Sequence, residues 1–176
     1  LTVILEKADT LGLSLGITKA AVSGGARFPA RREAYAARGI TTRQCYATAD
    51  LGNIAYESEA MEGMIVDEGV IVEIVRPGTS DPVSEGEVGE VVVTTLNPDY
   101  PLVRFATGDM SAVLSGESPC GRTNQRIKGW MGRADQSTKI KGMFVRPEQV
   151  AERVARHPEV SKARVVATRD GTADAL

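Results

Sequence analysis

Segment 18–46 constrains the fold more than any other part of the sequence. Residues 18–23 predict a short strand that runs into a glycine pair, and residues 41–46 predict a second strand. Between them, residues 29–38 carry a helical pattern that opens on a proline and is followed by a glycine. Strand, glycine turn, helix and strand form a βαβ unit, which is normally right-handed and has its ligand crevice at the carboxyl ends of the strands. We therefore expect an α/β fold, with candidate site residues just beyond positions 23 and 46.

The regions on either side of this unit predict different structure. Residues 1–12 predict a helix, because apolar residues recur at three- and four-residue spacing up to Gly12. After residue 52 the pattern changes to β-branched runs separated by turn residues, over residues 53–56, 64–66, 70–75 and 88–96. Short strands at this spacing indicate a small β-barrel or an antiparallel sheet.

Segment 100–109 carries the sharpest candidate site. The apolar run 100–103 predicts a strand, and Thr107-Gly108 then lets the backbone turn sharply, since glycine has no Cβ penalty at unusual φ. We expect Asp109 at the end of that strand, where a ligand can approach closely. Its carboxylate has two acceptor oxygens, which suit two neighbouring hydroxyls such as the 2′- and 3′-OH of a ribose. Taken alone, the same three residues are also an ordinary turn.

Charge and composition exclude several classes of partner. The net charge of −2 argues against a general polyanion binder, and 5% aromatic residues leave few platforms for stacking nucleic-acid bases. No apolar run reaches the ~20 residues that span a bilayer, so no membrane partner is expected. Charged residues are mostly acidic over 57–90 and mostly basic over 122–164. They form either two solvated faces or a basic face for a phosphorylated ligand.

The two cysteines and the N-terminus bear on compartment and processing. Cys45 and Cys120 are far apart, with no close Cys or His to complete a metal site, which fits a reducing, cytoplasmic location. The N-terminus lacks the basic start and long apolar core of a signal peptide. It also lacks an initiator Met, which suggests a processed or excised piece.

The C-terminal part predicts a second, smaller unit. Composition turns basic beyond Asp135, where we place a domain boundary. Strands are expected over residues 125–131 and 163–168, a hairpin over 138–145 and a helix over 147–156.

Five motifs occur in order along the chain: Ser23-Gly24-Gly25-Ala26, Tyr46-Ala47-Thr48-Ala49-Asp50, Arg104-Phe105-Ala106-Thr107-Gly108-Asp109, Cys120-Gly121-Arg122-Thr123, and Gly132-Arg133-Ala134-Asp135 with Lys139 and Lys141-Gly142 beyond it. In this order and spacing they resemble the adenylate-forming (acyl/aryl-CoA ligase) superfamily, and within it the phenylacetate–coenzyme A ligase-like group. The resemblance covers residues 1–166. It implies that residues 1–133 are the C-terminal part of a large AMP-binding adenylation domain. Residues 134–176 would then begin a small, mobile α+β domain.

The resemblance implies roles for the N-terminal motifs. Gly24, Gly25 and Ala26 would lie against the adenine, and Tyr46 would offer an aromatic face to the same ring. Thr48 would bond the phosphate. Asp50, where the family usually has Glu, would hold Mg²⁺ through a hard oxygen ligand one methylene shorter.

It also implies roles for the later motifs. Asp109 would bind the ribose, and Arg133 would also contact the nucleotide. Asp135 matches the hinge about which the small domain rotates, and Lys139, Lys141 and Gly142 match the segment that approaches the active site after rotation.

The implied activity is that of an ATP-dependent, AMP-forming acid–CoA ligase. Such an enzyme joins a carboxylic acid, here of the aromatic kind, to AMP and then transfers the acyl group to coenzyme A. The sequence contains neither the family's Ser/Thr/Gly-rich phosphate loop nor its catalytic Lys, so the isolated chain is expected to be inactive. A non-catalytic nucleotide- or CoA-binding remnant or regulatory module is the alternative, and the resemblance leaves a homodimer open.

One motif departs from the family. Ser118 stands where phenylacetate ligase-like chains often have the first cysteine of Cys-Pro-Cys-Gly-Arg-Thr. This substitution weakens the case for a metal at Cys120.

Overall fold

The computed structural model describes residues 1–24, 28–136, 138–140, 143–145, 147–166, 168–170 and 173–175. By its internal contacts the chain divides into two compact units, Leu1–Gln44 and Cys45–Leu176. Each unit is described below by itself. The predicted boundary between residues 133 and 134 does not coincide with this division and stays a prediction.

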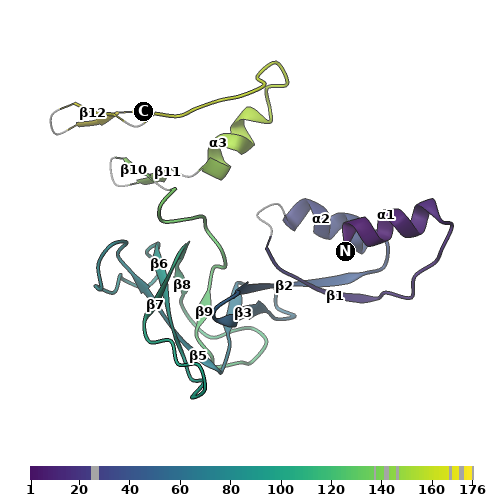
Figure 1. Cartoon of the computed structure of the whole chain (residues 1–176), viewed down its shortest axis with the longest axis horizontal. Helices are drawn as coiled ribbons and strands as arrows, with labels where there is room; N and C mark the ends of the chain where they lie inside the picture. Colours follow the sequence, from purple (N-terminus) through teal and green to yellow (C-terminus); the bar gives the residue numbers. More distant parts are fainter. Residues whose placement is uncertain are drawn as a thin grey trace. The chain divides into compact units, whose positions relative to one another are not determined.

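The first unit is the predicted βαβ unit with a helix before it (Figure 1). Its elements are α1 (Thr2–Thr10), β1 (Lys19–Val22), α2 (Phe28–Ala36) and the first residues of β2 (Thr41–Thr48). β1 and β2 pair in parallel, as a βαβ connection requires. Leu5, Tyr35 and Ile40 form the buried centre, and Arg38, just after α2, pairs with Asp9 of α1 at 3.0 Å.

The second unit contains two antiparallel sheets. The later residues of β2 pair with β3 (Gly52–Glu57), which continues through β4 (Met64–Val66) and β9 (Arg126–Ile127) to β8 (Val113–Leu114). The other sheet consists of β5 (Val70–Val75), β6 (Gly89–Thr95) and β7 (Phe105–Ser111), all labelled in Figure 1. Ile54, Val93 and Ile127, which come from both sheets, are fully buried in one core. The mixed α/β prediction is confirmed, and within the described residues the antiparallel strands do not close into a barrel.

The prediction that a strand ends just before Asp109 was wrong. Residues 101–103 form no strand, since the Thr95 hydroxyl accepts the Leu102 N–H at 2.9 Å and folds this segment back on β6. The strand is β7, and it continues through Asp109 to Ser111. Gly108, with φ of 72°, makes an irregularity inside the strand instead of ending it, and the β6–β7 register shifts there.

The C-terminal part agrees with the sequence only partly. β10 (Thr138–Ile140), β11 (Met143–Val145) and α3 (Pro147–Val154) confirm the hairpin and the helix. The predicted strand 125–131 shrinks to the two residues of β9, and residues 163–166 form no strand. Two strands that the sequence did not predict, β12 (Thr168–Asp170) and β13 (Ala173–Ala175), pair with each other. In the described part of the chain no helix has the length and apolar character needed to cross a bilayer.

The loop 115–124 is held in place by a buried arginine. Arg126 is 6% exposed and donates from Nη2 to the carbonyls of Ser115, Gly116 and Glu117 at 3.0 to 3.2 Å. The Arg126 guanidinium therefore fixes the backbone of the loop through hydrogen bonds that do not involve the loop's side chains. This anchoring places Ser118, which is buried, beside the exposed Cys120.

Cys120 lies in a setting that favours its thiolate. The Ser118 hydroxyl is 3.0 Å from Cys120 Sγ. Hydrogen bonds from Ser118, then from Ser58 and the backbone at Arg122, lower the pKa of the Cys120 thiol to about 7. The thiol is thus protonated below neutral pH and ionised above it.

Replacing Gly89 tests how tightly β6 packs. A Cβ on Gly89 would lie 2.4 Å from the Val75 carbonyl oxygen, which is backbone and cannot move aside. We expect Gly89→Ala to lower the free energy of unfolding by about 1–3 kcal/mol. The control is Gly69→Ala, whose Cβ would meet only the carboxylate of Asp67, at 3.1 Å. Equal denaturation midpoints for the two variants would contradict the packing argument.

Alkylation of Cys120 tests its pKa. In a Cys45→Ser background, the iodoacetamide rate should reach half its maximum near pH 7, where the pKa of about 7 places the ionisation midpoint. Ser118→Ala removes the first hydrogen bond to the thiolate, so the midpoint should move to higher pH. Thr123→Ala, in the same loop, is the control and should leave it unchanged. If the pH midpoint of alkylation is the same in Ser118→Ala, the Ser118 hydroxyl is not what lowers the pKa of Cys120.

Candidate functional site

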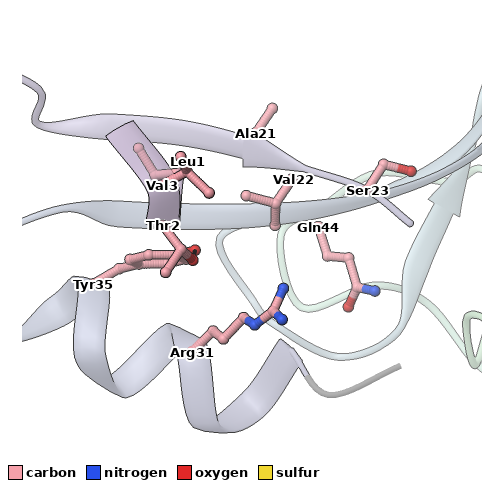
Figure 2. Close-up of a pocket in the computed structure, with 9 residues that line it drawn as sticks. All are labelled: Leu1, Thr2, Val3, Ala21, Val22, Ser23, Arg31, Tyr35 and Gln44. Atoms are coloured by element: carbon pink, nitrogen blue, oxygen red, sulfur yellow. Dashed lines mark hydrogen bonds between the residues drawn. The ribbon is translucent and has the colours of Figure 1, made fainter. Parts of the chain in front are cut away.

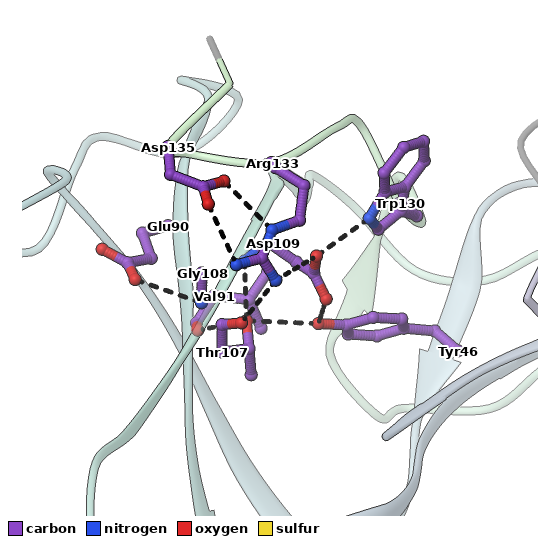
Figure 3. A network of polar contacts seen from close by, with 9 residues as sticks. All are labelled: Tyr46, Glu90, Val91, Thr107, Gly108, Asp109, Trp130, Arg133 and Asp135. Carbon is purple, nitrogen blue, oxygen red and sulfur yellow. Dashed lines mark hydrogen bonds and ion pairs between the residues drawn. The ribbon is translucent and has the colours of Figure 1, made fainter. Parts of the chain in front are cut away.

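Asp109 is the centre of a polar cluster in the second unit (Figure 3). Its side chain is 12% exposed and lies within β7. Oδ2 accepts a hydrogen bond from the Tyr46 hydroxyl at 2.9 Å, and Oδ1 accepts one from the Trp130 indole N–H at 3.0 Å. Arg133 Nη1 lies 3.5 Å from Oδ1. We call Tyr46, Thr107, Asp109, Trp130 and Arg133 the Asp109 cluster.

Backbone pairing brings the later members of the cluster to β7. The Met110 N–H donates to the Gly132 carbonyl at 2.8 Å, and the Ala134 N–H donates to the Gly108 carbonyl at 2.7 Å. Asp109 and Arg133 form a bridge between these two bonds. Segment 130–134 is therefore an extended chain laid along the second half of β7.

Thr107 and Gly108 shape the strand around the carboxylate. The Thr107 hydroxyl donates to the Val91 carbonyl at 2.9 Å and accepts the Asp109 N–H at 3.1 Å. The Gly108 N–H, freed from the ladder by the register shift, donates to a Glu90 carboxylate oxygen at 3.2 Å. A Cβ on Gly108 would lie 2.6 Å from Arg133 Nη2. The positive φ favours glycine at this position, and a Cβ would also displace the guanidinium from its present place.

Arg133 links Asp109 to the start of the C-terminal segment. Its Nη1 donates to the Thr107 carbonyl at 3.2 Å, and its Nε donates to Asp135 Oδ1 at 3.1 Å. The hydrogen bond from Arg133 is the chief cause that lowers the pKa of Asp135, and the same bond raises the pKa of Arg133. With 39% of its side chain exposed, the guanidinium remains accessible to an anionic ligand.

Tyr46 serves as a hydrogen-bond donor. Its side chain is buried, and burial is the main cause that raises the pKa of the phenol above its ordinary value. The hydroxyl lies 3.3 Å from Thr107 Oγ1 and 2.9 Å from Asp109 Oδ2, so the shorter contact to the charged oxygen is the stronger bond. The phenol therefore stays protonated and holds one oxygen of Asp109.

The structure brings together four of the residues that the sequence singled out: Tyr46, Asp109, Arg133 and Asp135 (Figure 3). Thr48 and Asp50 lie in or next to the β2–β3 turn, where the Thr48 hydroxyl accepts the Leu51 N–H at 3.1 Å and Asp50 is exposed. Gly24 follows β1 in the first unit with φ of 76°. Gly25, Ala26, Lys141 and Gly142 lie outside the described residues, as does the side chain of Lys139.

The sequence analysis did not single out Trp130 or Glu90, and it named Thr107 only as a turn residue. Trp130 and Thr107 contact the carboxylate group or its backbone, and Glu90 binds the Gly108 N–H. A signal for Trp130 existed, since an indole N–H needs a partner when buried, and this tryptophan is three residues before Arg133. No local pattern pointed to Glu90, which reaches the site only through the β6–β7 register.

A separate cavity of about 520 Å³ lies in the first unit (Figure 2). Apolar side chains, among them Val3 and Val22, line one part of it, and Arg31 of α2 and Gln44 of β2 extend into the same space (Figure 2). None of the described residues that the sequence singled out as binding or catalytic lines this cavity. Ser23, the first residue of the Ser23-Gly24-Gly25-Ala26 motif, does line it.

The described residues include no group of three or more His, Cys, Asp or Glu side chains that could hold a metal ion. A Mg²⁺ ion that is held by one or two carboxylates and by substrate phosphates needs no such group. The exposed Asp50 carboxylate fits that mode of binding.

The chain is similar in sequence to enzymes of known function. No family model matches it. The phenylacetate–coenzyme A ligase of Thermus thermophilus is 32% identical over 142 residues, which are 77% of this chain and 32% of that enzyme. The Escherichia coli phenylacetate–coenzyme A ligase is 29% identical over 136 residues, covering 74% of this chain and 30% of the enzyme. The chain thus spans about a third of the length of the curated relatives it matches.

Solved structures agree. The open conformation of a 2-hydroxyisobutyryl-CoA ligase, in complex with 2-HIB-AMP and CoA, has a TM-score of 0.77 at 25% identity. The match covers 89% of this chain and 39% of that one. An anthranilate CoA ligase in complex with anthranoyl-AMP shares the fold, with a TM-score of 0.59 at 18% identity over 89% of this chain and 32% of that one. The chain belongs to the adenylate-forming superfamily of acyl-CoA ligases and is similar, within it, to part of the phenylacetate–coenzyme A ligases.

Proposed function

We propose that this chain is part of an ATP-dependent, AMP-forming ligase that converts a carboxylic acid into its acyl-adenylate and then into a CoA thioester. The similarity to phenylacetate–coenzyme A ligases supports an aromatic acid as the substrate. The solved relatives in complex with an acyl-AMP and CoA support both nucleotide and CoA binding. We further propose a cytoplasmic protein, in keeping with two free cysteines.

The Asp109 cluster is the observation that carries this proposal. A carboxylate that is held by Tyr46 and Trp130 is an immobile acceptor for ribose hydroxyls, and ordering it in advance lowers the entropy cost of binding. Arg133 lies beside it with an exposed cationic face for the nucleotide. Tyr46 would contribute its ring to the adenine site, together with Gly24, Gly25 and Ala26.

Thr48 and Asp50 would serve the phosphates. Asp50 would supply one carboxylate ligand to Mg²⁺, and the nucleotide phosphates and water would supply the others. When bound, the ion neutralises phosphate charge during the attack on the α-phosphate. Thr48 would donate its hydroxyl hydrogen to a phosphate oxygen, and it can do so while its oxygen still accepts the Leu51 N–H in the β2–β3 turn.

The chemistry requires no protein nucleophile. The substrate carboxylate attacks the α-phosphate of ATP and releases pyrophosphate, and the thiol of CoA then displaces AMP. The protein contributes positioning and electrostatic stabilisation. In this chain those contributions come from the fixed acceptor Asp109 and the neighbouring cation Arg133.

The C-terminal segment would move between the two half-reactions. We propose Asp135 as the hinge at the junction of residues 1–133 with 134–176, and Lys141-Gly142 as part of the segment that reaches the site after rotation. The printed sequence includes neither a Ser/Thr/Gly-rich phosphate loop nor the family's catalytic Lys, so the 176-residue chain by itself should catalyse no pyrophosphate exchange. A non-catalytic binding module is the competing hypothesis, and pyrophosphate exchange by the whole ligase would exclude it.

Replacing Asp109 tests the ribose assignment. In the whole ligase, Asp109→Ala should weaken ATP binding by about a hundredfold or more, because two hydrogen bonds to a charged acceptor contribute roughly 1.5–3 kcal/mol each. The 2′,3′-dideoxy analogue of ATP should bind the wild type poorly and the variant about equally poorly. Equilibrium binding of both nucleotides to both proteins gives the four values needed. If Asp109→Ala lowers only thermal stability and leaves the preference for ATP intact, the residue is structural.

Replacing Asp135 tests the hinge. Asp135→Pro fixes φ near −65° and should leave pyrophosphate exchange measurable while lowering thioester formation about a hundredfold, since small misplacements have effects of that size. The control is Asp135→Ala, which also breaks the hydrogen bond to Arg133 but leaves the backbone free. An equal loss of both half-reactions in the proline variant, or the same profile in both variants, would rule out the hinge.

A further inference from the structure

The irregularity in β7 leaves part of its backbone without a regular partner on β6. The three residues between Ala106 and Met110 lie opposite Val91 alone, because the β6–β7 register shifts there. A backbone N–H or C=O group that leaves the ladder needs another hydrogen-bond partner when it is shielded from water. In this irregular stretch, side chains supply several of those partners.

The peptide group that joins Thr107 to Gly108 is held at both ends by charged side chains (Figure 3). Its carbonyl accepts a hydrogen bond from Arg133 Nη1 at 3.2 Å, and its N–H donates one to Glu90 Oε1, also at 3.2 Å. A peptide group is planar and trans, so its C=O and N–H point in opposite directions. The cation and the carboxylate therefore hold opposite ends of one peptide group.

Gly108 by itself does not fix the orientation of this peptide group. Rotating the group by half a turn would change φ of residue 108 from 72° to a negative value, and glycine populates both regions about equally readily. After that rotation the N–H would face the guanidinium and the carbonyl oxygen would face the carboxylate, and both contacts are repulsive. The charges of Glu90 and Arg133 thus favour the same orientation, the one observed.

The Thr107 carbonyl is the anchor of Arg133 that belongs to a strand backbone. Asp135, which accepts a hydrogen bond from Arg133 Nε at 3.1 Å, has 63% of its side chain exposed and is the proposed hinge. The Asp109 carboxylate lies further away, with Oδ1 at 3.5 Å from Nη1. When Asp135 moves, the position of the guanidinium therefore depends on this carbonyl, and the orientation of the carbonyl depends on Glu90.

We propose that Glu90 is a positioning residue for Arg133: by accepting the Gly108 N–H, it orients the Thr107 carbonyl that holds the guanidinium beside Asp109. This inference rests on the proposed function, in which Arg133 contacts the nucleotide. Glu90 needs no contact with the nucleotide in this role, because it acts through one peptide group. What it must supply is an acceptor oxygen at the Gly108 N–H.

The first experiment tests that hydrogen bond in the whole ligase without any nucleotide. Glu90→Met keeps the length of the side chain but removes the acceptor, whereas Glu90→Gln keeps an acceptor oxygen. Exchange of the Gly108 amide hydrogen with water, followed by NMR, should be about tenfold faster in Glu90→Met and nearly unchanged in Glu90→Gln. The control is Glu87→Ala, which removes an exposed carboxylate just before β6. Equal exchange in the two Glu90 variants would overturn the proposal and leave the proposed function untouched.

The second experiment measures the consequence for equilibrium binding of ATP to the whole ligase. Glu90→Met should weaken ATP binding about tenfold, whereas Glu90→Gln should stay within about threefold of the wild type. The same Glu90→Met substitution should cause no further loss in an Arg133→Ala background, since its effect passes through the guanidinium. A purely structural role of Glu90 would give the same loss in both backgrounds.

The outcomes separate the proposal from the function on which it rests. If Glu90→Met weakens ATP binding by the same factor with and without Arg133, or lowers only the melting temperature, the proposal fails and the proposed function stands. If Glu90→Gln loses as much affinity as Glu90→Met, the acceptor oxygen is not what matters, and the proposal fails again. If Arg133→Ala itself leaves ATP affinity unchanged, the nucleotide contact of Arg133 in the proposed function fails, and the proposal fails with it.

Discussion

The pairing of segment 130–134 with β7 is the interaction on which the candidate site depends. Backbone hydrogen bonds from the Met110 N–H to Gly132 and from the Ala134 N–H to Gly108 hold the two segments side by side. This pairing carries Trp130 and Arg133 to Asp109, although they are 21 and 24 positions further along the chain. Without it, a carboxylate in the interior of the second unit would face Tyr46 alone, and a buried charge with too few partners is strongly unfavourable.

The donors of the cluster stabilise the charge of Asp109 without using every acceptor position of its carboxylate, so a ligand can still bind there. Tyr46 and Trp130 are neutral donors held by the core, whereas Arg133 is a partly exposed cation that also binds Asp135. Rigid donors orient the carboxylate, and the exposed cation can follow a ligand. The arrangement therefore joins a preformed acceptor to the segment at which the proposed domain movement begins.

The similarity to acyl-CoA ligases gives this geometry its context. The chain corresponds to about a third of the length of the phenylacetate–coenzyme A ligases it matches. What the second unit contributes by itself is the Asp109 cluster. Its members Tyr46, Asp109 and Arg133 come from three separate motifs of the sequence, which is why their order along the chain identified the family.

Local patterns determined the βαβ unit, the strands β3 to β6 and helix α3, and the order of the motifs singled out Asp109 and Arg133 as candidate site residues. These follow from the periodicity of apolar residues, from turn residues and from the order of the motifs, all of which can be read from a single sequence. The tertiary structure decided the rest. Whether Gly108 ends a strand or bends it depends on the β6–β7 register, and the short β9 depends on pairing with β4 and β8. Trp130 acquired its place in the cluster for the same reason: its hydrogen bond to Asp109, 21 positions earlier in the sequence, exists only once segment 130–134 has paired with β7.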